Sequence, residues 1–203
     1  TKDATIREIH HRVKNNLQTV AALLRLQSRR MSNSDAKDAL KQAMGRVSAI
    51  AVVHEILSQN FEEQVAFDEV ADRILHMVGD VAASSGSVVA RREGSFGEVP
   101  AETATALSLA TTELCQNAIE HSLDSSSGNV IVRPHRTDDA LVVDIVSDGK
   151  PLPEGFSLDN HRSSLGLSIV TTMMQDLGGT FTLEDNSDRV GTCARLVIPL
   201  QRL

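Results

Sequence analysis

The sequence predicts an α+β protein in which an N-terminal helical hairpin precedes an α/β sandwich. Apolar residues recur at three- and four-residue steps through the first third of the chain, which is typical of amphipathic helices. Beyond that point, helical stretches are interspersed with short alternating or continuous apolar runs, which are typical of strands. Only 2% of the 203 residues are aromatic, so the core is expected to be aliphatic.

The hairpin is predicted from two amphipathic stretches that meet at a polar cluster, residues 31–35. This cluster is typical of a turn followed by a helix N-cap, and no Gly or Pro precedes it. Two helices cannot bury both apolar stripes alone, whereas pairing with a second hairpin forms a four-helix bundle, so a homodimer is expected. The first stripe consists of Ile6, Ile9, Val13, Leu17, Val20, Leu24 and Gln27, and the second extends over residues 36–57.

The remaining pattern predicts the order of elements in the second part of the chain. Helices are expected at residues 67–83, 100–122 and 165–177, and strands at residues 87–92, 129–135, 140–147, 180–185 and 193–200. The polar stretch 150–164 contains two prolines and a glycine and is typical of a loop. This order predicts a mixed sheet with helices covering one face. We therefore assign the hairpin to residues 1–62 and the sandwich domain to residues 63–203.

Charge and composition exclude several classes of function. The net charge is −7 and base-stacking aromatic residues are scarce, so no direct binding to nucleic acid is expected. No apolar run approaches the length of a membrane span, and no membrane association is expected for this fragment. Cys115 and Cys193 are widely separated and are expected to be buried thiols in a reducing cytoplasm. Because the sequence opens at Thr1 within a helical pattern, we expect it to be a piece of a longer protein.

A polar segment on the first predicted helix contains adjacent histidines. At about 100° per residue, His11 lies roughly 160° from the centre of the apolar stripe and therefore faces solvent, whereas His10 lies about 60° from it. Glu8 and Asn15 share the outer side with His11. An exposed imidazole on a rigid helix is a usable nucleophile near pH 7, because a large fraction is neutral. A solvated surface histidine accounts for the same pattern.

The second part contains three short polar patterns. Glu113 and Asn117 are one helical turn apart, and an acid and an amide on one helix face can hold Mg²⁺. Asp148 follows a predicted strand and precedes Gly149, so its carboxylate could accept a hydrogen bond from an exocyclic amine. Small residues at 163–168 open a helix, where backbone N–H groups and the helix dipole can meet phosphate.

Taken in this order, the polar patterns of both parts of the chain resemble those of a known protein family. Residues 11–18, HRVKNNLQ, resemble the phosphoacceptor motif of two-component sensor histidine kinases of the HWE-related type. The second part resembles the GHKL ATPase domain of the gyrase, Hsp90 and MutL superfamily. In it, residues 113–121 match the N box, Asp148 and Gly149 match the G1 box, and residues 164–167 match the G2 box. Residues 9–29 are especially similar to the actinobacterial PdtaS-like kinases.

The resemblance implies ATP and Mg²⁺ as cofactors and assigns roles to individual residues. His11 would be the autophosphorylated residue, Glu113 would assist catalysis, and Asn117 with Glu113 would hold the metal. The position after the phosphoacceptor, often a general base, is Arg12 here, and Glu8 is the substitute we consider. Residues 155–163 would form the ATP lid. The residues expected to contact the nucleotide are Asn117, His121, Asp148, Gly149, Arg162, Ser164, Leu165, Gly166, Leu167 and Thr192.

The G1 box departs from its usual Asp-x-Gly-x-Gly form. An alignment without gaps places Ser147 at the Asp position and Pro151 at the second Gly position. We nevertheless assign adenine recognition to Asp148, with Gly149 and Thr192 in support, because the exocyclic amine of adenine needs an acceptor.

The function implied is ATP-dependent autophosphorylation on His11, followed by transfer to an aspartate of a response regulator receiver domain. In the PdtaS-like branch that regulator carries an ANTAR RNA-binding output. A cytoplasmic homodimer is expected. One alternative is a histidine phosphotransferase or pseudokinase of the same fold with weak or absent ATP turnover, which the G1 departures favour. An anti-sigma type Ser/Thr kinase shares the ATPase fold but lacks the hairpin, and a dimeric scaffold remains open.

Overall fold

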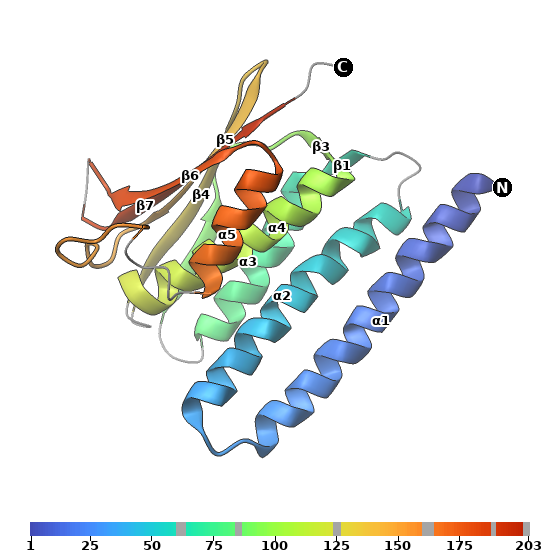
Figure 1. Ribbon diagram of the computed structural model, residues 1–203, viewed down its shortest axis with the longest axis horizontal. Coiled ribbons are helices and arrows are strands. Elements are labelled where there is room, and N and C mark those ends of the chain that lie inside the picture. The colour runs from blue at the N-terminus through green and yellow to red at the C-terminus, as the bar shows by residue number, and fades with distance from the viewer. Residues whose placement is uncertain (60–63, 84–86, 124–126, 160–164, 188–189, 201–203) are drawn as a thin grey trace. The chain divides into compact units, whose positions relative to one another are not determined.

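A computed structural model describes residues 1–59, 64–83, 87–123, 127–159, 165–187 and 190–200 (Figure 1). The chain divides into two compact units. The hairpin unit consists of residues 1–65 and 98–109, and the sheet unit consists of residues 66–97 and 110–203. Each unit is described here by itself.

The hairpin unit is built on two long antiparallel helices, α1 (Lys2–Arg30) and α2 (Ser34–Gln59). The Thr1 side chain accepts a hydrogen bond from the backbone N–H of Ala4 and caps α1. Asn33 caps α2, because its Oδ1 accepts from the backbone N–H groups of Asp35 and Ala36. The polar cluster at residues 31–35 therefore forms the expected turn and cap. A two-stranded sheet of β1 (Gln64–Ala66) and β3 (Glu98–Pro100) was not anticipated from sequence.

The apolar stripe of α1 divides into two neighbouring faces. The two buried residues of α1 are Ala21 and Ser28, and these share a face with His10 and Leu24, which are half-buried. A second face is apolar but exposed, and it includes Ile9, Val20 and Leu23, exposed by 53%, 43% and 61%. The expected stripe runs between these two faces. His10 therefore lies on the α2-facing side and not at its edge.

The sheet unit contains a five-stranded mixed sheet in the order β2-β4-β5-β7-β6. Only β2 and β4 run parallel, and the other neighbours are antiparallel. The expected mixed sheet is therefore observed. Its strands are β2 (Val88–Arg92), β4 (Gly128–Arg136), β5 (Ala140–Ser147), β6 (Thr180–Asp185) and β7 (Thr192–Pro199).

Helices lie on one face of this sheet, as expected. They are α3 (Phe67–Ala83), α4 (Ala101–Asn117), of which the sheet unit holds the second half, and α5 (Leu165–Asp176). The strands bury alternate residues toward them, and in β5 every second side chain up to Ser147 is buried. Aliphatic residues such as Ile74, Ile145 and Leu196 dominate the core. The opposite face of the sheet is exposed or half-buried, apart from Ile131, which is 9% exposed.

Two further features bear on the site. After Asn117 the helix continues as one π-helical turn, η1 (Ala118–Ser122), where sequence predicted a regular helix to residue 122. Such turns place side chains differently from an α-helix and are frequent at functional sites. Within the described part of the chain, no helix is both long and apolar enough to cross a membrane.

Candidate functional site

His11 lies on the solvent side of α1, as its helical spacing predicts. Its Nδ1 lies 3.2 Å from the side-chain amide nitrogen of Asn15, one turn later on the same helix. The Asn15 amide can present either its nitrogen or its oxygen to Nδ1, so the contact is made by Nδ1 in both cases. The other ring nitrogen, Nε2, therefore remains available on the exposed side.

Glu8 forms an ion pair with Arg12, one turn later on α1, at 2.8 Å between the carboxylate and Nε. The hydrogen bond from Arg12, together with its charge, lowers the pKa of Glu8. A carboxylate with a lowered pKa is a weaker base. Arg12 therefore holds the Glu8 carboxylate in place and lowers its basicity, although Glu8 is the general base considered from sequence. The two side chains form a charged pair beside His11.

His10 points toward α2, whereas His11 faces solvent. Its Nδ1 lies 2.9 Å from Nδ1 of His54, and the two ring centroids are 5.1 Å apart. Partial burial lowers the pKa of His54, and the charge of His10 lowers it further. The sequence pattern places His10 beside the first apolar stripe and His54 within the second, so both are expected to pack, but it does not predict that the two rings meet.

Glu113 and Asn117 occupy the half of α4 that belongs to the sheet unit. Glu113 is 5% exposed and Asn117 is half-buried, one turn later and immediately before η1. A carboxylate so deeply buried is unusual on a merely solvated helix face. His121, within η1, is exposed.

Three buried hydroxyl groups meet where η1, β5 and β7 come together. Ser147 Oγ lies 2.6 Å from Ser122 Oγ and 2.9 Å from Thr192 Oγ1, and Ser122 Oγ donates to the Lys150 carbonyl at 3.1 Å. Ser122 has one hydroxyl proton, which it donates to the Lys150 carbonyl. All three hydroxyl protons are used when Thr192 donates to Ser147 and Ser147 donates to Ser122. Thr192 and Ser147 then retain free lone pairs, and the chain can accept a further hydrogen bond.

Glycines allow the backbone to close around this hydroxyl chain. A Cβ at Gly149 would overlap the Ser122 carbonyl, and a Cβ at Gly191 would overlap the Ser147 carbonyl. Gly191 also has φ +120°, which L side chains rarely adopt. The G1 glycine, the end of the N box and Thr192 are therefore brought together.

Asp148 does not lie with this chain. Its Oδ1 accepts from the backbone N–H of Asn129 at 2.7 Å, and its Oδ2 accepts from the Asn129 side-chain amide at 2.7 Å. Partial burial works to raise the pKa of Asp148, but the Asn129 hydrogen bonds outweigh it and hold the pKa below its usual value. The register of β5 is unbroken through Ser147 and Thr192, so Ser147 points inward and Asp148 comes one position later.

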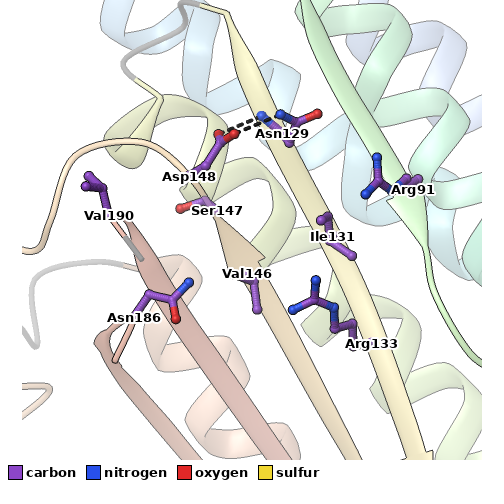
Figure 2. Close-up of a pocket in the computed structure, with 9 residues that line it drawn as sticks. All are labelled: Arg91, Asn129, Ile131, Arg133, Val146, Ser147, Asp148, Asn186 and Val190. Carbon is purple, nitrogen blue, oxygen red and sulfur yellow. Dashed lines mark hydrogen bonds between the residues drawn. The ribbon is translucent and has the colours of Figure 1, made fainter. Parts of the chain in front are cut away.

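Figure 2 shows Asp148 and Asn129 at one end of an open pocket of about 250 Å³. The pocket is lined by Arg91, Asn129, Ile131, Arg133, Val146, Ser147, Asp148, Asn186 and Val190. The outward-facing side chains of β4 and β5 form its floor, which is the sheet face away from the helices. The assignment of adenine recognition to Asp148 requires a shift of one residue in the alignment with the G1 box. Strand β5 contains no bulge that would accompany such a shift.

The remaining expected nucleotide contacts lie at the start of α5. Leu165 is 63% exposed, Gly166 is half-buried and Leu167 is 8% exposed and faces the core. Arg162 and Ser164 lie outside the described residues, as does part of the expected lid. Among the residues that are described, no group of three or more His, Cys, Asp or Glu is placed to hold a metal ion.

Comparison with known protein families gives two matches along the chain. Residues 8–82 match the family described as Histidine kinase, and residues 102–202 match the family described as Histidine kinase-, DNA gyrase B-, and HSP90-like ATPase. The chain belongs to the histidine kinases. It is 49% identical over 205 residues to the sensor histidine kinase PdtaS of Mycobacterium tuberculosis, and the alignment covers 100% of this chain and 40% of that protein.

Other histidine kinases are similar in sequence and fold. PdtaS of Mycolicibacterium smegmatis is 47% identical, with 100% of this chain and 41% of that protein covered. The chain thus spans well under half the length of these relatives. The histidine kinase domain of the Erythrobacter litoralis blue-light activated histidine kinase superposes with a TM-score of 0.67 at 25% identity, covering 98% of this chain and 92% of that chain. The mycobacterial sensor histidine kinase MprB gives a TM-score of 0.54 at 25% identity, covering 70% and 99%.

In the sequence of this histidine kinase, Ser147 stands out only as a departure from the G1 box, and Ser122 does not stand out at all. The alternation of β5 is the signal that predicts an inward-pointing Ser147 side chain. Counting back from Ser147 by twos gives Ile145, Val143 and Leu141, all of them apolar. The next side chain on that face must point the same way.

Proposed function

We propose that this chain is the catalytic core of a sensor histidine kinase that transfers the γ-phosphoryl group of ATP to His11. The observation that carries the proposal is the exposed imidazole of His11, held through Nδ1 by Asn15 with Nε2 left free. A phosphoryl acceptor must reach both a nucleotide and a later acceptor, so its reacting atom has to be accessible. The family match over both parts of the chain supports the same reaction.

In the proposed step, the Nε2 lone pair of His11 forms a bond to the γ-phosphorus, the bond from that phosphorus to the bridging oxygen breaks, and ADP leaves. Attack through Nε2 requires the tautomer with its proton on Nδ1. With its amide turned so that Oδ1 and not Nδ2 faces the ring, Asn15 can accept that proton and thereby hold the reactive tautomer. Glu8 and Arg12 then act as a charged pair beside the ring, and a role for Glu8 as general base stays a prediction.

We place the adenine end of ATP at the hydroxyl chain of Ser122, Ser147 and Thr192. Its free lone pairs can accept a hydrogen bond from the exocyclic amine of adenine, as a carboxylate would, although with less strength because the group is neutral. The Asn129 contacts of Asp148 support a structural role for that carboxylate, which fastens the end of β5 to the start of β4. The phosphates would be received at the α5 N-terminus around Gly166.

Glu113 and Asn117 fit Mg²⁺ by the chemistry of their oxygen atoms. Mg²⁺ is commonly bound through one or two protein oxygens plus substrate phosphates and water, so a pair of protein ligands is sufficient. A bound Mg²⁺ would neutralise charge on the phosphates. Asn117 would supply an amide oxygen to it, and Glu113 would supply a carboxylate directly or through water.

We further propose that the chain forms a homodimer and passes its phosphoryl group to an aspartate on a response regulator receiver domain. The exposed apolar face of α1 around Ile9, Val20 and Leu23 supports pairing with a second hairpin. The similarity to PdtaS supports a regulator with an ANTAR RNA-binding output as the partner. The reaction consumes ATP, which supports a cytoplasmic site.

A second candidate is a phosphotransfer protein or pseudokinase of the same fold with weak ATP turnover. The observation that favours it is the buried neutral Ser147 where the G1 box usually has Asp. The two candidates differ in whether the chain labels itself from ATP.

The test is incubation of the protein with γ-labelled ATP and Mg²⁺. We expect label that is stable in base and lost in acid, as a phosphohistidine is, and no label on His11→Gln. The matched control is His76→Gln, because His76 is an exposed histidine paired with Asp80 on α3. Label on His11→Gln at the wild-type level would overturn the assignment of His11. An unlabelled wild type that accepts phosphate from a phosphorylated receiver would establish the second candidate.

A further inference from the structure

We infer that His10 and His54 form a clamp that positions the turn of α1 carrying His11, and that His54 is a positioning residue for the phosphoryl acceptor. The inference rests on the proposed role of His11. It concerns the two imidazoles on the α2-facing side of α1, which the proposed reaction does not use.

The geometry of the pair fixes its protonation. A separation of 2.9 Å between the two Nδ1 atoms is a hydrogen-bond distance. One Nδ1 must therefore carry a proton and the other must offer a lone pair. The two rings accordingly adopt opposite tautomers, with one proton between them. Their tilt of 37° and centroid separation of 5.1 Å bring the rings into contact as well as the nitrogen atoms.

The clamp lies where α1 has few other buried contacts. The buried residues of α1 are Ala21 and Ser28, both in the half near the hairpin turn, and residues 2–20 contribute only half-buried side chains to the contact with α2. His10 lies in that weakly held half, adjacent in sequence to His11. A hydrogen bond between two half-buried rings has a narrow range of low-energy geometries, whereas half-buried aliphatic contacts tolerate sliding. The pair therefore sets the register and rotation of the turn that presents His11.

Protonation acts on this contact in two steps. A first proton can be taken by the donor ring at its Nε2, and the hydrogen bond between the Nδ1 atoms is kept and becomes charge-assisted. A second proton must occupy the remaining Nδ1 lone pair, so two N–H groups and two positive charges would face each other. The contact between the two Nδ1 atoms is then lost.

The two cations on α1 oppose the second proton, whereas the acidic residue on α2 favours it. On α1, Arg7 and Lys14 lie one turn before and one turn after His10, and both are half-buried. On α2, Glu55 adjoins His54 and is the nearest acidic residue in that helix. The contacts of α1 in the described residues are chiefly with α2. The lowered pKa of His54, due first to burial and then to the charge of His10, agrees with this arrangement.

The sign of the pH dependence follows. The neutral form of His54 is favoured in the folded hairpin, so its contribution is complete above its ordinary pKa of 6.5 and is lost as the pH falls through the lower folded value. We expect autophosphorylation of His11 to fall more steeply on acidification in the wild type than in a variant whose residue 54 cannot be protonated.

Two variants of His54 separate positioning from packing. His54→Leu fills the space but removes the hydrogen bond, and we expect the rate of autophosphorylation at pH 7.5 to fall about tenfold with an unchanged KM for ATP. His54→Asn retains a polar atom near the Nδ1 position but cannot be protonated. It should recover most of the rate at pH 7.5 and lose less of it than wild type between pH 7.5 and 5.5. His76→Asn is the matched control and should reproduce the wild-type profile.

A second measurement does not depend on activity. The titration of the His10 ring, followed by ¹⁵N NMR of the imidazole nitrogens, should shift in His54→Asn and stay unchanged in His76→Asn. An unchanged His10 titration would overturn the clamp, and so would His54→Leu with the rate and pH profile of wild type. If His54→Leu fails to fold by circular dichroism, His54→Asn and the His10 titration decide. A wild type that never labels itself, yet shows the shifted His10 titration, would overturn the proposed function and leave the clamp standing.

Discussion

The hairpin unit and the sheet unit hold their polar groups in opposite ways. In the hairpin, the groups around His11 come from one stretch of helix and are exposed, and Arg12 and Asn15 lie within one turn of it. In the sheet unit, the hydroxyl chain draws on three elements that are distant in sequence. Ser147 and Thr192 are 1% and 7% exposed.

This difference matches what each site has to do in the proposed reaction. A phosphoryl acceptor must be reached by more than one partner, and a short helical motif can supply everything that the imidazole needs. A nucleotide pocket gains from polar groups that are already fixed and dry, because hydrogen bonds are then made without reorganisation. Such a pocket depends on a close fit between backbone segments. The sheet unit should therefore be sensitive to small changes that the hairpin tolerates.

The largest expected effect comes from adding one methyl group where backbone segments touch. Gly149→Ala should lower the free energy of unfolding of the sheet unit by about 3 kcal/mol, because its Cβ would overlap the Ser122 carbonyl. The matched control is Gly79→Ala within α3, where nothing lies within 4 Å of the added Cβ. That change should raise stability by about 1 kcal/mol through helix propensity.

Alkylation of Cys115 by iodoacetamide measures this effect within the sheet unit alone. Burial raises the pKa of Cys115 to about 12, so the thiol reacts only when the unit opens. Labelling should be about 100-fold faster in Gly149→Ala and slower in Gly79→Ala. Equal labelling rates for the two variants would show that the contact between Gly149 and the end of η1 is not close in solution.

The second expected effect concerns the exposed apolar face of α1. Leu23→Lys should weaken the homodimer by about 2 kcal/mol per subunit, because a leucine that the bundle would bury becomes a cation. Gln18→Lys introduces the same charge at an exposed position on the other side of the helix and should leave the dimer intact. Light scattering after gel filtration, over a range of concentrations, gives the dissociation constant. Equal dissociation constants for the two variants would exclude this face from the interface.

Much of the fold follows from periodicity because the apolar pattern is regular. The predicted limits of α3 and β5 are those observed, at residues 67–83 and 140–147. The short strands β1 and β3 were missed because three residues hold too little pattern to signal a strand. The π-helical turn η1 was missed because the same residues also suit an α-helix, and the turn arises where the helix meets the end of β5.

The site was less predictable than the fold, for reasons that differ between the units. The exposure of His11 follows from helical spacing alone. The contact between His10 and His54 joins residues 44 positions apart. Helical spacing places each histidine on or beside a packing face, but it does not show which residue of the other helix each one meets. Sequence favours Asp148 for adenine recognition because its carboxylate is the stronger acceptor, and that assignment stays a prediction. The pleat of β5 turns Ser147 inward, which makes Ser147 the competing candidate.

The smallest expected effect decides between those two neighbours. Ser147→Asp should tighten ATP binding about fivefold, because an ionised acceptor beside the Ser122 and Thr192 hydroxyls makes a stronger hydrogen bond to adenine than a neutral one does. Asp148→Asn preserves the shape of the contact with Asn129 and should change ATP affinity by less than about twofold. Equilibrium titration with a fluorescent ATP analogue, with circular dichroism to confirm folding, measures both. Tighter binding in Ser147→Asp alone places the adenine at the buried hydroxyl chain. Weaker ATP binding in Asp148→Asn, with unchanged binding in Ser147→Asp, would place the adenine at the exposed end of β5. The contrast between an exposed phosphoryl acceptor on α1 and a buried nucleotide site in the sheet unit would then be lost.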